Sequence, residues 1–350
     1  MFYYFIFVFM VLVGLFFLNK KQKILSYFFI GLAVVLLFSF RDLSVGTDTI
    51  NYVDIFLSSS QFNLNDFKIE PFFIFLNYLI YNFNESIFLY FLIVSILWYI
   101  VWLLNIEIFS TFHKDISWLT LLTTSAYLTL FNITRQSIAM ALSVLALGFL
   151  LQKKYFNFMF ISLLAVGTHY SSILILLAFI LVLKINNPLI CFLLSLFFTI
   201  TMSITLVEYA SLFSVRYSSY SDTSDSLTGI SLIIFSILKL FLFYYSYYKF
   251  YLNDYLYKLF LSIFSIGFSI LIVFKFLGLP DDGPVRLSIY FLIFEVFLYP
   301  YLFYIIKDMH VRSVLKFLFY SFMISVFFYT IYSGAGGLYP YSVSEFLING

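Results

Sequence analysis

The sequence predicts an all-α, polytopic integral membrane protein with about 10–13 transmembrane or re-entrant helices. Of its 350 residues, 63% are hydrophobic and only 10% are charged, whereas a soluble globular domain has about 25% charged residues. Apolar runs of about 20 residues recur from end to end, and each is long enough to cross a bilayer core of about 30 Å. These observations exclude a conventional soluble domain.

The apolar runs place the predicted spans along the chain. The first run, FYYFIFVFMVLVGLFFL, has no basic leader and no small-residue cleavage site, so we expect a retained span. Residues 71–82 are too few to span comfortably, and we expect this run to lie re-entrant or interfacial. The predicted spans are residues 2–18, 24–40, 87–108, 116–131, 134–151, 156–168, 170–184, 188–207, 230–249, 256–277, 286–306 and 315–333.

Basic residues in short loops orient the spans, because Lys-rich and Arg-rich loops stay on the cytoplasmic side. Placing the basic loops inside puts both termini outside, together with the PDDGP loop and larger extracytoplasmic loops at about 41–70 and 208–229. This scheme requires 156–184 to be a hairpin of two short helices that turns near His169. With no repeat or linker visible, residues 1–350 are predicted to form a single transmembrane domain. The basic loops are NKKQK at 19–23, QKK at 152–154, KDMHVR at 307–312, and the loop flanked by Lys249 and Lys258.

Ionisable residues gather at the span ends that this orientation places outside. Such residues at membrane depth usually face a cavity or a partner. The inner loops carry mostly lysine, whereas the outer ends carry arginine, whose planar fork matches phosphate and carboxylate oxygens in pairs. We therefore expect an anionic ligand at the outer face. The outer group comprises Arg41, Arg135, His169, Arg216, Tyr217, Asp281, Asp282 and Arg286.

Several of these residues also have a simpler interpretation. Arg41 could be an anchor that snorkels to the membrane surface, paired with Asp42. His169 could be a packing histidine, and Asp48 could only cap a turn. Arg135 begins a helix, where a cation opposes the helix dipole, so a functional role is favoured there.

Other classes of site are not indicated. The net charge of +2 does not suggest a nucleic-acid partner. One cysteine and three histidines support neither a disulfide framework nor a His-rich metal centre. The sequence has no P-loop, H-E-x-x-H or G-x-S-x-G motif, and no organic cofactor is expected. The carboxylates of Asp48, Asp54, Asp281 and Asp282 leave a divalent cation open.

Five motifs follow one another along the chain: RDLSVGTDTINY (41–52), NITRQSIAMAL (132–142), QKKYF (152–156), AVGTHYSSILI (165–175) and RYSSY (216–220). In this order they resemble the EpsG/Wzy family of bacterial polysaccharide repeat-unit polymerases. The resemblance covers most of the chain, and the C-terminal third matches only generally.

The resemblance implies a membrane glycosyltransferase that polymerises polyprenyl-diphosphate-linked oligosaccharides into O-antigen of lipopolysaccharide, capsule or exopolysaccharide. It implies action at the outer face of the bacterial cytoplasmic (inner) membrane, in contact with membrane lipid. The implied protein partners are chain-length regulator and flippase proteins.

Such a transfer needs a cation for the departing diphosphate and a base for the acceptor hydroxyl. We expect Arg135, with Arg41 or Arg216, to bind the diphosphate. His169 is the expected base, because a histidine with a pKa of about 6.5 accepts a proton near neutral pH; Asp48 is the runner-up. The remaining substrate-binding candidates are Thr47, Tyr52, Gln136, Tyr217, Asp281, Asp282 and Arg286.

The alternative function is a flippase or transporter for lipid-linked oligosaccharide or another anionic solute, which would also need arginine in a membrane cavity. Transporters place their sites near the bilayer midplane, between structural repeats. An outer cavity would favour the polymerase, and a midplane site the transporter.

Overall fold

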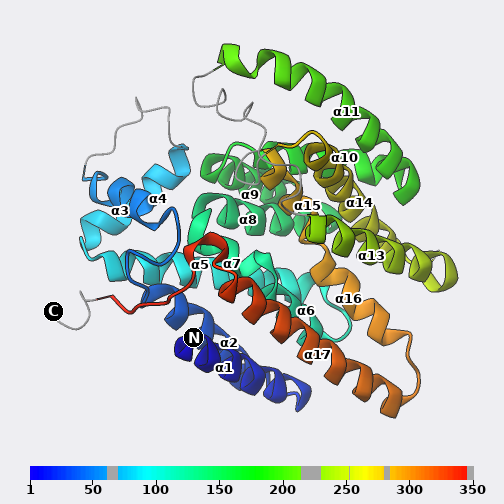
Figure 1. Cartoon of the computed structure of the whole chain (residues 1–350), viewed down its shortest axis with the longest axis horizontal. Coiled ribbons are helices and arrows are strands. Elements are labelled where there is room, and N and C mark those ends of the chain that lie inside the picture. Colours follow the sequence, from blue (N-terminus) through cyan, green and yellow to red (C-terminus); the bar gives the residue numbers. More distant parts are fainter. Residues whose placement is uncertain (61–69, 214–229, 252, 280–283, 345–350) are drawn as a thin grey trace. The chain divides into compact units, whose positions relative to one another are not determined.

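The computed structural model describes residues 1–60, 70–213, 230–251, 253–279 and 284–344. Within these ranges the chain is built from helices and contains no strand beyond one isolated antiparallel bridge, Arg41 with Val343 (Figure 1). Six helices of the described part are long and apolar enough to cross a membrane. The all-α, polytopic fold class is confirmed.

The chain divides into two compact units, and each is described by itself. The first unit comprises Met1–Ile173 and Ile306–Gly350, and the second Leu174–Ile305. Helix α10 (Ser172–Ile185) begins at the boundary. The first unit contains α1 (Phe2–Asn19), α2 (Lys23–Ser39), α3 (Thr49–Leu57), α4 (Pro71–Phe83), α5 (Ile87–Phe109), α6 (Lys114–Thr123), α7 (Ser125–Asn132), α8 (Thr134–Leu151), α9 (Tyr155–Thr168), α17 (Met309–Tyr332) and the 3-10 turn Ala335–Gly337.

Helix α8 is the central element of the first unit, and 78% of its residues are buried. Its alanines and serines allow close packing against α5. Two polar side chains of α5 fasten the pair: Trp98 Nε1 donates to Ser137 Oγ at 2.9 Å, and Asn105 Nδ2 donates to the Ala141 carbonyl at 2.9 Å. The N-terminal residues of α8, which include Arg135, are thereby held at one end of this core.

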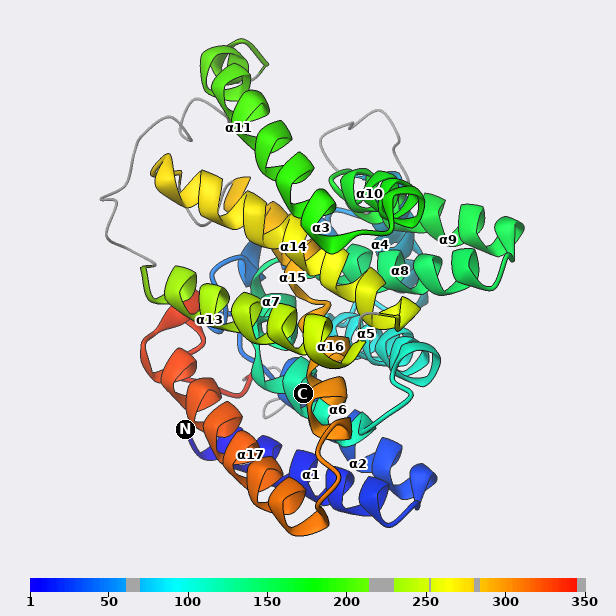
Figure 2. The same cartoon turned by 90° about the vertical axis from the view of Figure 1, so that its right-hand side faces the viewer.

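Helices α1 and α17 form an outer layer of the first unit. Only 17% of an 18-residue stretch of α17 and 33% of α1 are buried, and their outer faces carry large apolar side chains such as Phe9 and Phe317. Helices α1 and α17 lie side by side (Figure 2). They meet through rings, with Phe5 against Phe328 and Phe7 against Phe327. Apolar outer faces of this kind match a lipid environment.

The second unit is organised around α14, and 78% of an 18-residue stretch of this helix is buried. Serine contacts join it to its neighbours, including Ser269 Oγ at 2.6 Å from Ser195 Oγ. A partly buried ion pair joins α13 to α16, with Lys239 Nζ 2.6 Å from Glu295 Oε2. The elements are α11 (Pro188–Phe213), α13 (Ile230–Ser246) with the π-turn Tyr247–Tyr251, α14 (Tyr255–Phe276), the 3-10 turn Pro284–Ser288, α15 (Ile289–Leu292) and α16 (Glu295–Tyr304).

Most predicted spans coincide with helices to within a few residues. The predicted break before residue 170 is confirmed, because α9 ends at Thr168 and α10 begins at Ser172. The short run 71–82 forms α4. Its place in the membrane, and the single-domain organisation of 1–350, stay predictions.

One predicted span, residues 116–131, is divided into two helices, whereas residues 286–306 are built from successive helical turns and remain one of the six membrane-length segments. Residues 116–131 form α6 and α7, separated at Thr124, whose backbone is extended. The Thr124 hydroxyl donates to the Thr120 carbonyl at 2.7 Å, which satisfies a helix end where the chain bends. Residues 286–306 form a 3-10 turn, α15 and α16 in succession.

Candidate functional site

A buried carboxylate joins two of the residues that the sequence singled out. Glu70 Oε1 lies 2.6 Å from His169 Nδ1, and Glu70 Oε2 lies 2.5 Å from Arg135 Nη1. The Glu70 side chain is 5% exposed, whereas Arg135 is 20% and His169 28% exposed. The acid is therefore enclosed, while the two basic groups still reach the surface. We call Glu70, Arg135 and His169 the triad.

The position of Glu70 follows from the residue after it. Pro71 occupies the first turn of α4, where its missing N–H leaves no hydrogen bond unmade. A residue before proline is restricted to extended backbone, and Glu70 has ψ 138°. Glu70 is thus the N-cap of α4, but its side chain makes no capping bond and points to the triad instead. The positive end of the helix dipole favours its charge.

A close helix contact brings His169 to the same place. His169 is the C-cap of α9, and its N–H donates to the Ala165 carbonyl at 3.0 Å. Two residues earlier, a Cβ on Gly167 would lie 2.9 Å from the Cβ of Phe72. Only glycine lets the end of α9 approach the start of α4 this closely. In the Gly-Thr-His sequence, Gly167 therefore sets the distance between α9 and α4, and His169 provides the side chain that meets Glu70.

Arg135 lies in the first turn of α8, and its guanidinium lies near two aromatic rings. Its guanidinium carbon is 6.0 Å from the ring centre of Tyr52 and 5.8 Å from that of Phe73. A cation at a helix N-terminus is unfavourable, and the Glu70 carboxylate compensates for it. The Nε atom of Arg135 is buried and has no hydrogen-bond partner among the described residues.

Electrostatics keep the acid ionised. Burial raises the pKa of Glu70, but the hydrogen bond to His169 and the charges of Arg135 and His169 outweigh it, so the net shift is downward. Burial raises the pKa of Tyr52, although the neighbouring Arg135 opposes this. At neutral pH the site therefore contains a carboxylate, a guanidinium, a neutral phenol and one imidazole.

Arg41 does not contact the triad. It is buried at a separate place, with 1% of its surface exposed. Its Nη1 donates to the Phe131 carbonyl at 3.0 Å. Its guanidinium carbon lies 4.1 Å from the ring centre of Phe38 and 4.4 Å from that of Phe91. Burial lowers the pKa of Arg41 to about 10, and it stays protonated at neutral pH. Arg41 also lines a pocket of about 300 Å³ with Ser39, Leu43, Glu85, Ser86, Ile87, Phe88, Phe91 and Ser344.

The VGTD segment after Arg41 is held by two distant parts of the first unit. The Thr47 N–H donates to Asn132 Oδ1 at 2.8 Å, and the Gly46 N–H donates to the Gly337 carbonyl at 3.0 Å. Gly46 has φ +95°, which other residues rarely adopt, and a Cβ there would lie 2.9 Å from Asn132 Oδ1. The motif residues around 46 and 132 are thus direct neighbours.

The C-terminal segment 336–344 packs against the same loop. The Asp42 N–H donates to the Ser342 carbonyl at 3.0 Å, and the Ser344 N–H donates to the Phe40 carbonyl at 3.0 Å. The Tyr341 hydroxyl donates to the Leu37 carbonyl at 2.8 Å. The loop that carries Arg41 and Asp48 therefore depends on the last described residues of the chain.

The structure brings together His169, Arg135 and Tyr52 from the predicted set. Asp48 is the N-cap of α3, one helical turn before Tyr52, and Gln136 is buried beside Arg135 in α8. Arg286 lies in the second unit. Arg216, Tyr217, Asp281 and Asp282 lie outside the described residues. Their assigned roles, like those of Asp48, Thr47 and Arg41, stay predictions.

Sequence reasoning missed Glu70. It belongs to a loop with several acids, and no local pattern links it to His169 or Arg135. The available signal was the Glu-Pro pair directly before an apolar helix, which marks an acid at a helix start.

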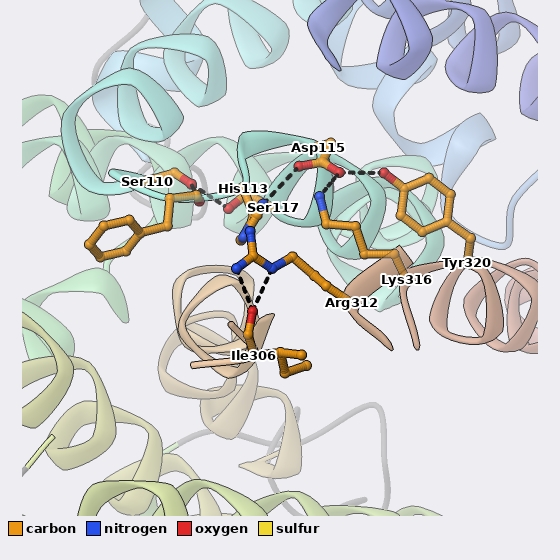
Figure 3. A network of polar contacts seen from close by, with 9 residues as sticks. Ser110, His113, Asp115, Ser117, Ile306, Arg312, Lys316 and Tyr320 are labelled. Atoms are coloured by element: carbon orange, nitrogen blue, oxygen red, sulfur yellow. Dashed lines mark hydrogen bonds and ion pairs between the residues drawn. The ribbon is translucent and has the colours of Figure 1, made fainter. Parts of the chain in front are cut away.

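A second polar cluster lies elsewhere in the first unit and links α6 to α17 (Figure 3). Asp115 accepts from Lys316 Nζ at 2.6 Å and from the Tyr320 hydroxyl at 2.7 Å, and His113 Nδ1 lies 4.0 Å away. Arg312 Nε donates to the Ile306 carbonyl at 2.7 Å. Arg312 belongs to the basic loop 307–312 that the sequence assigns to the cytoplasmic side, and the satisfied pairing of the cluster fits an anchoring role.

The family profile that matches this chain covers nearly all of it. The EpsG family profile aligns with residues 23–343. The chain belongs to the EpsG family. No curated protein and no solved structure matches it. The aligned range runs from the start of α2 to Val343, and it includes every residue of the triad. The recognition made from the motifs is confirmed, and the triad is therefore a feature of an EpsG-family membrane protein.

Proposed function

We propose that this EpsG-family protein is a membrane glycosyltransferase that polymerises polyprenyl-diphosphate-linked oligosaccharide repeat units into a surface polysaccharide. The observation that carries the proposal is the triad, which sets a partly exposed imidazole and a partly exposed guanidinium on one buried carboxylate. Family membership supports the class of product, and the triad supports the chemistry. The product is an O-antigen, a capsule or an exopolysaccharide.

The triad offers the two groups that this transfer requires. Arg135 stabilises the negative charge that develops on the departing diphosphate, as a preorganised cation does in a site of low dielectric constant. His169 accepts the proton of the attacking sugar hydroxyl. Tyr52, close to Arg135, presents a flat amphipathic ring of the kind that contacts sugars. The energy for the reaction resides in the diphosphate linkage, so no nucleotide-binding motif is needed.

The positions of these residues on their helices support action at a membrane surface. Glu70 precedes α4, Arg135 lies in the first turn of α8, and His169 caps the end of α9. A diphosphate at the lipid headgroups would meet such helix ends, whereas a midplane site would draw on helix centres. The charge distribution of the loops supports the proposal that this surface faces the outer side of the cytoplasmic membrane.

One observation favours the alternative of a flippase or transporter. The Lys239–Glu295 pair lies within apolar segments of the second unit, and ionisable residues at membrane depth often mark a transport path. The pair is fully matched at 2.6 Å, which also fits a purely structural link. We therefore favour the polymerase.

The test is the length distribution of surface polysaccharide in the native strain after deletion of the gene. Polymerase loss would leave one repeat unit in place of a ladder. Loss of every repeat, with lipid-linked units trapped on the cytoplasmic side, would establish the flippase instead. Complementation with H169A should fail to restore the ladder at normal membrane levels. The matched control is H310Q, which changes an exposed histidine at the start of α17 and should restore the full ladder.

A further inference from the structure

We infer that Glu70 is the positioning residue of the site: it fixes the tautomer and orientation of His169, so that Nε2 is the atom that takes the acceptor proton. The catalytic part of this inference rests on the proposed function. The structural part, the tautomer of His169, does not. No motif in the sequence assigns Glu70 a role, and both of its oxygens are occupied in the structure.

The tautomer follows from donor and acceptor counting. An ionised carboxylate can only accept hydrogen bonds. At 2.6 Å from Glu70 Oε1, Nδ1 of His169 must therefore carry a hydrogen. In a neutral imidazole the other nitrogen, Nε2, is then the acceptor. His169 Nε2 is left with the lone pair that a general base requires.

Three features keep Glu70 ionised and in place. Arg135 binds the second oxygen, and the Tyr170 N–H approaches the first at 3.4 Å. The carboxylate also sits at the positive end of the α4 dipole. Its backbone is set by Pro71, and the approach of α9 is set by Gly167. These fixed partners pre-organise the imidazole rather than leaving it to rotate.

The transfer can be written without any change in the protonation of Glu70. The acceptor oxygen forms a bond to the anomeric carbon, and its proton passes to His169 Nε2. The bond from that carbon to the diphosphate oxygen breaks, and its electron pair leaves with the diphosphate beside Arg135. Glu70 stabilises the imidazolium that results, and the proton later leaves His169 for water.

The variant E70Q tests this role because glutamine fits the site in one orientation only. Its amide oxygen must face the Arg135 donor, since an amide nitrogen there would place donor against donor. The amide nitrogen then donates to His169 Nδ1, which forces the hydrogen onto Nε2 and removes the base. We expect kcat to fall by at least about 100-fold, the contribution typical of general-base catalysis, with a smaller change in KM. The control E107Q alters a carboxylate of α5 that pairs with Lys114 and belongs to neither the triad nor the Arg41 pocket.

The tautomer is measured directly by nitrogen NMR of labelled imidazole in purified full-length protein. The chain has three histidines, so H113Q/H310Q leaves His169 as the single reporter. We expect a protonated Nδ1 and an unprotonated Nε2 in this background, and the reverse after E70Q is added. A protonated Nε2 before E70Q is added, or an E70Q enzyme within threefold of wild-type kcat, would overturn the inference.

The two proposals fail in distinguishable ways. A wild-type protein that forms no polymer from purified lipid-linked repeat units would refute the proposed function, whatever the NMR spectrum shows. The expected tautomer and its reversal would still support the positioning role of Glu70. An active enzyme with the wrong tautomer would refute that role and leave the function standing.

Discussion

Glu70 and His169 are 99 positions apart in the chain, and their side chains meet at 2.6 Å. The same carboxylate binds Arg135 at 2.5 Å. Breaking a buried charge pair by removing one partner is far more damaging than losing an exposed pair. Substitutions in the triad should therefore affect activity in ways that report on each partner.

Replacing Arg135 by lysine keeps the charge but removes the planar fork. Lysine cannot bind Glu70 and an incoming diphosphate as arginine does. We expect R135K to lower the rate of polymer formation at least about tenfold, the equivalent of one charge-assisted hydrogen bond. The measurement is the rate with purified lipid-linked repeat units. R312K, which alters a guanidinium bound to a backbone carbonyl in the second cluster, is the control. Wild-type ladders from R135A cells at normal membrane levels would contradict the role of Arg135.

Gly167 should be sensitive to a single methyl group. In G167A the new Cβ would lie 2.9 Å from the Cβ of Phe72, so α9 must move away from α4. Overpacking of this kind costs about 1–3 kcal/mol, and the shift separates His169 from Glu70. We expect a lower melting temperature and a larger loss of activity than stability alone explains. L163A, on the exposed face of α9, should change neither, and equal activity of G167A and wild type would argue against this spacing role.

Arg41 should behave as a structural residue in the resting protein. R41A would leave the Phe131 carbonyl without its donor and empty the ring cage, at a cost of about 2–3 kcal/mol. We expect reduced membrane levels and a lower melting temperature, whereas R135K, which keeps a cation beside Glu70, should accumulate normally. Thermal unfolding in detergent distinguishes the two. An R41A protein as stable as wild type but inactive would instead favour the predicted contact of Arg41 with the diphosphate.

His113 should make the protein sensitive to acid. Burial, with the charges of Lys316 and Arg312 opposed by Asp115, lowers the pKa of His113 from 6.5 to about 4. Between these values the unfolded chain binds a proton that the folded chain does not, so the free energy of unfolding falls as pH decreases. We expect the melting temperature to drop less between pH 7 and pH 5 in H113Q than in wild type.

The control for this prediction is H310Q, because His310 is exposed. Its melting temperature should follow that of wild type at both pH values. An unchanged pH dependence in H113Q would show that another group governs acid sensitivity.

The helices were largely predictable because a bilayer fixes the length of each apolar run. One predicted span is interrupted at Thr124. The Thr124 hydroxyl donates to the Thr120 carbonyl, so the backbone can turn there without a proline or glycine. Arg135 and His169 were predictable as costly residues at span ends. Glu70 was not, because its role depends on a tertiary contact. The cage around Arg41 was hidden for the same reason: Phe38, Phe91 and Phe131 read as ordinary apolar residues until the fold brings them together.

The contact between Ser44 and Ser342 spans 298 positions, and this separation has a consequence for biosynthesis. At about 5–20 residues per second, the C-terminal partners of the loop that begins at Arg41 leave the ribosome about 15–60 s after the loop itself. The segment around Gly46 therefore lacks its final hydrogen bonds while the helices between it and residue 336 are being synthesised and inserted. A half-made chain cannot assemble this loop, so the order of synthesis delays its final structure until residues 336–344 have been made.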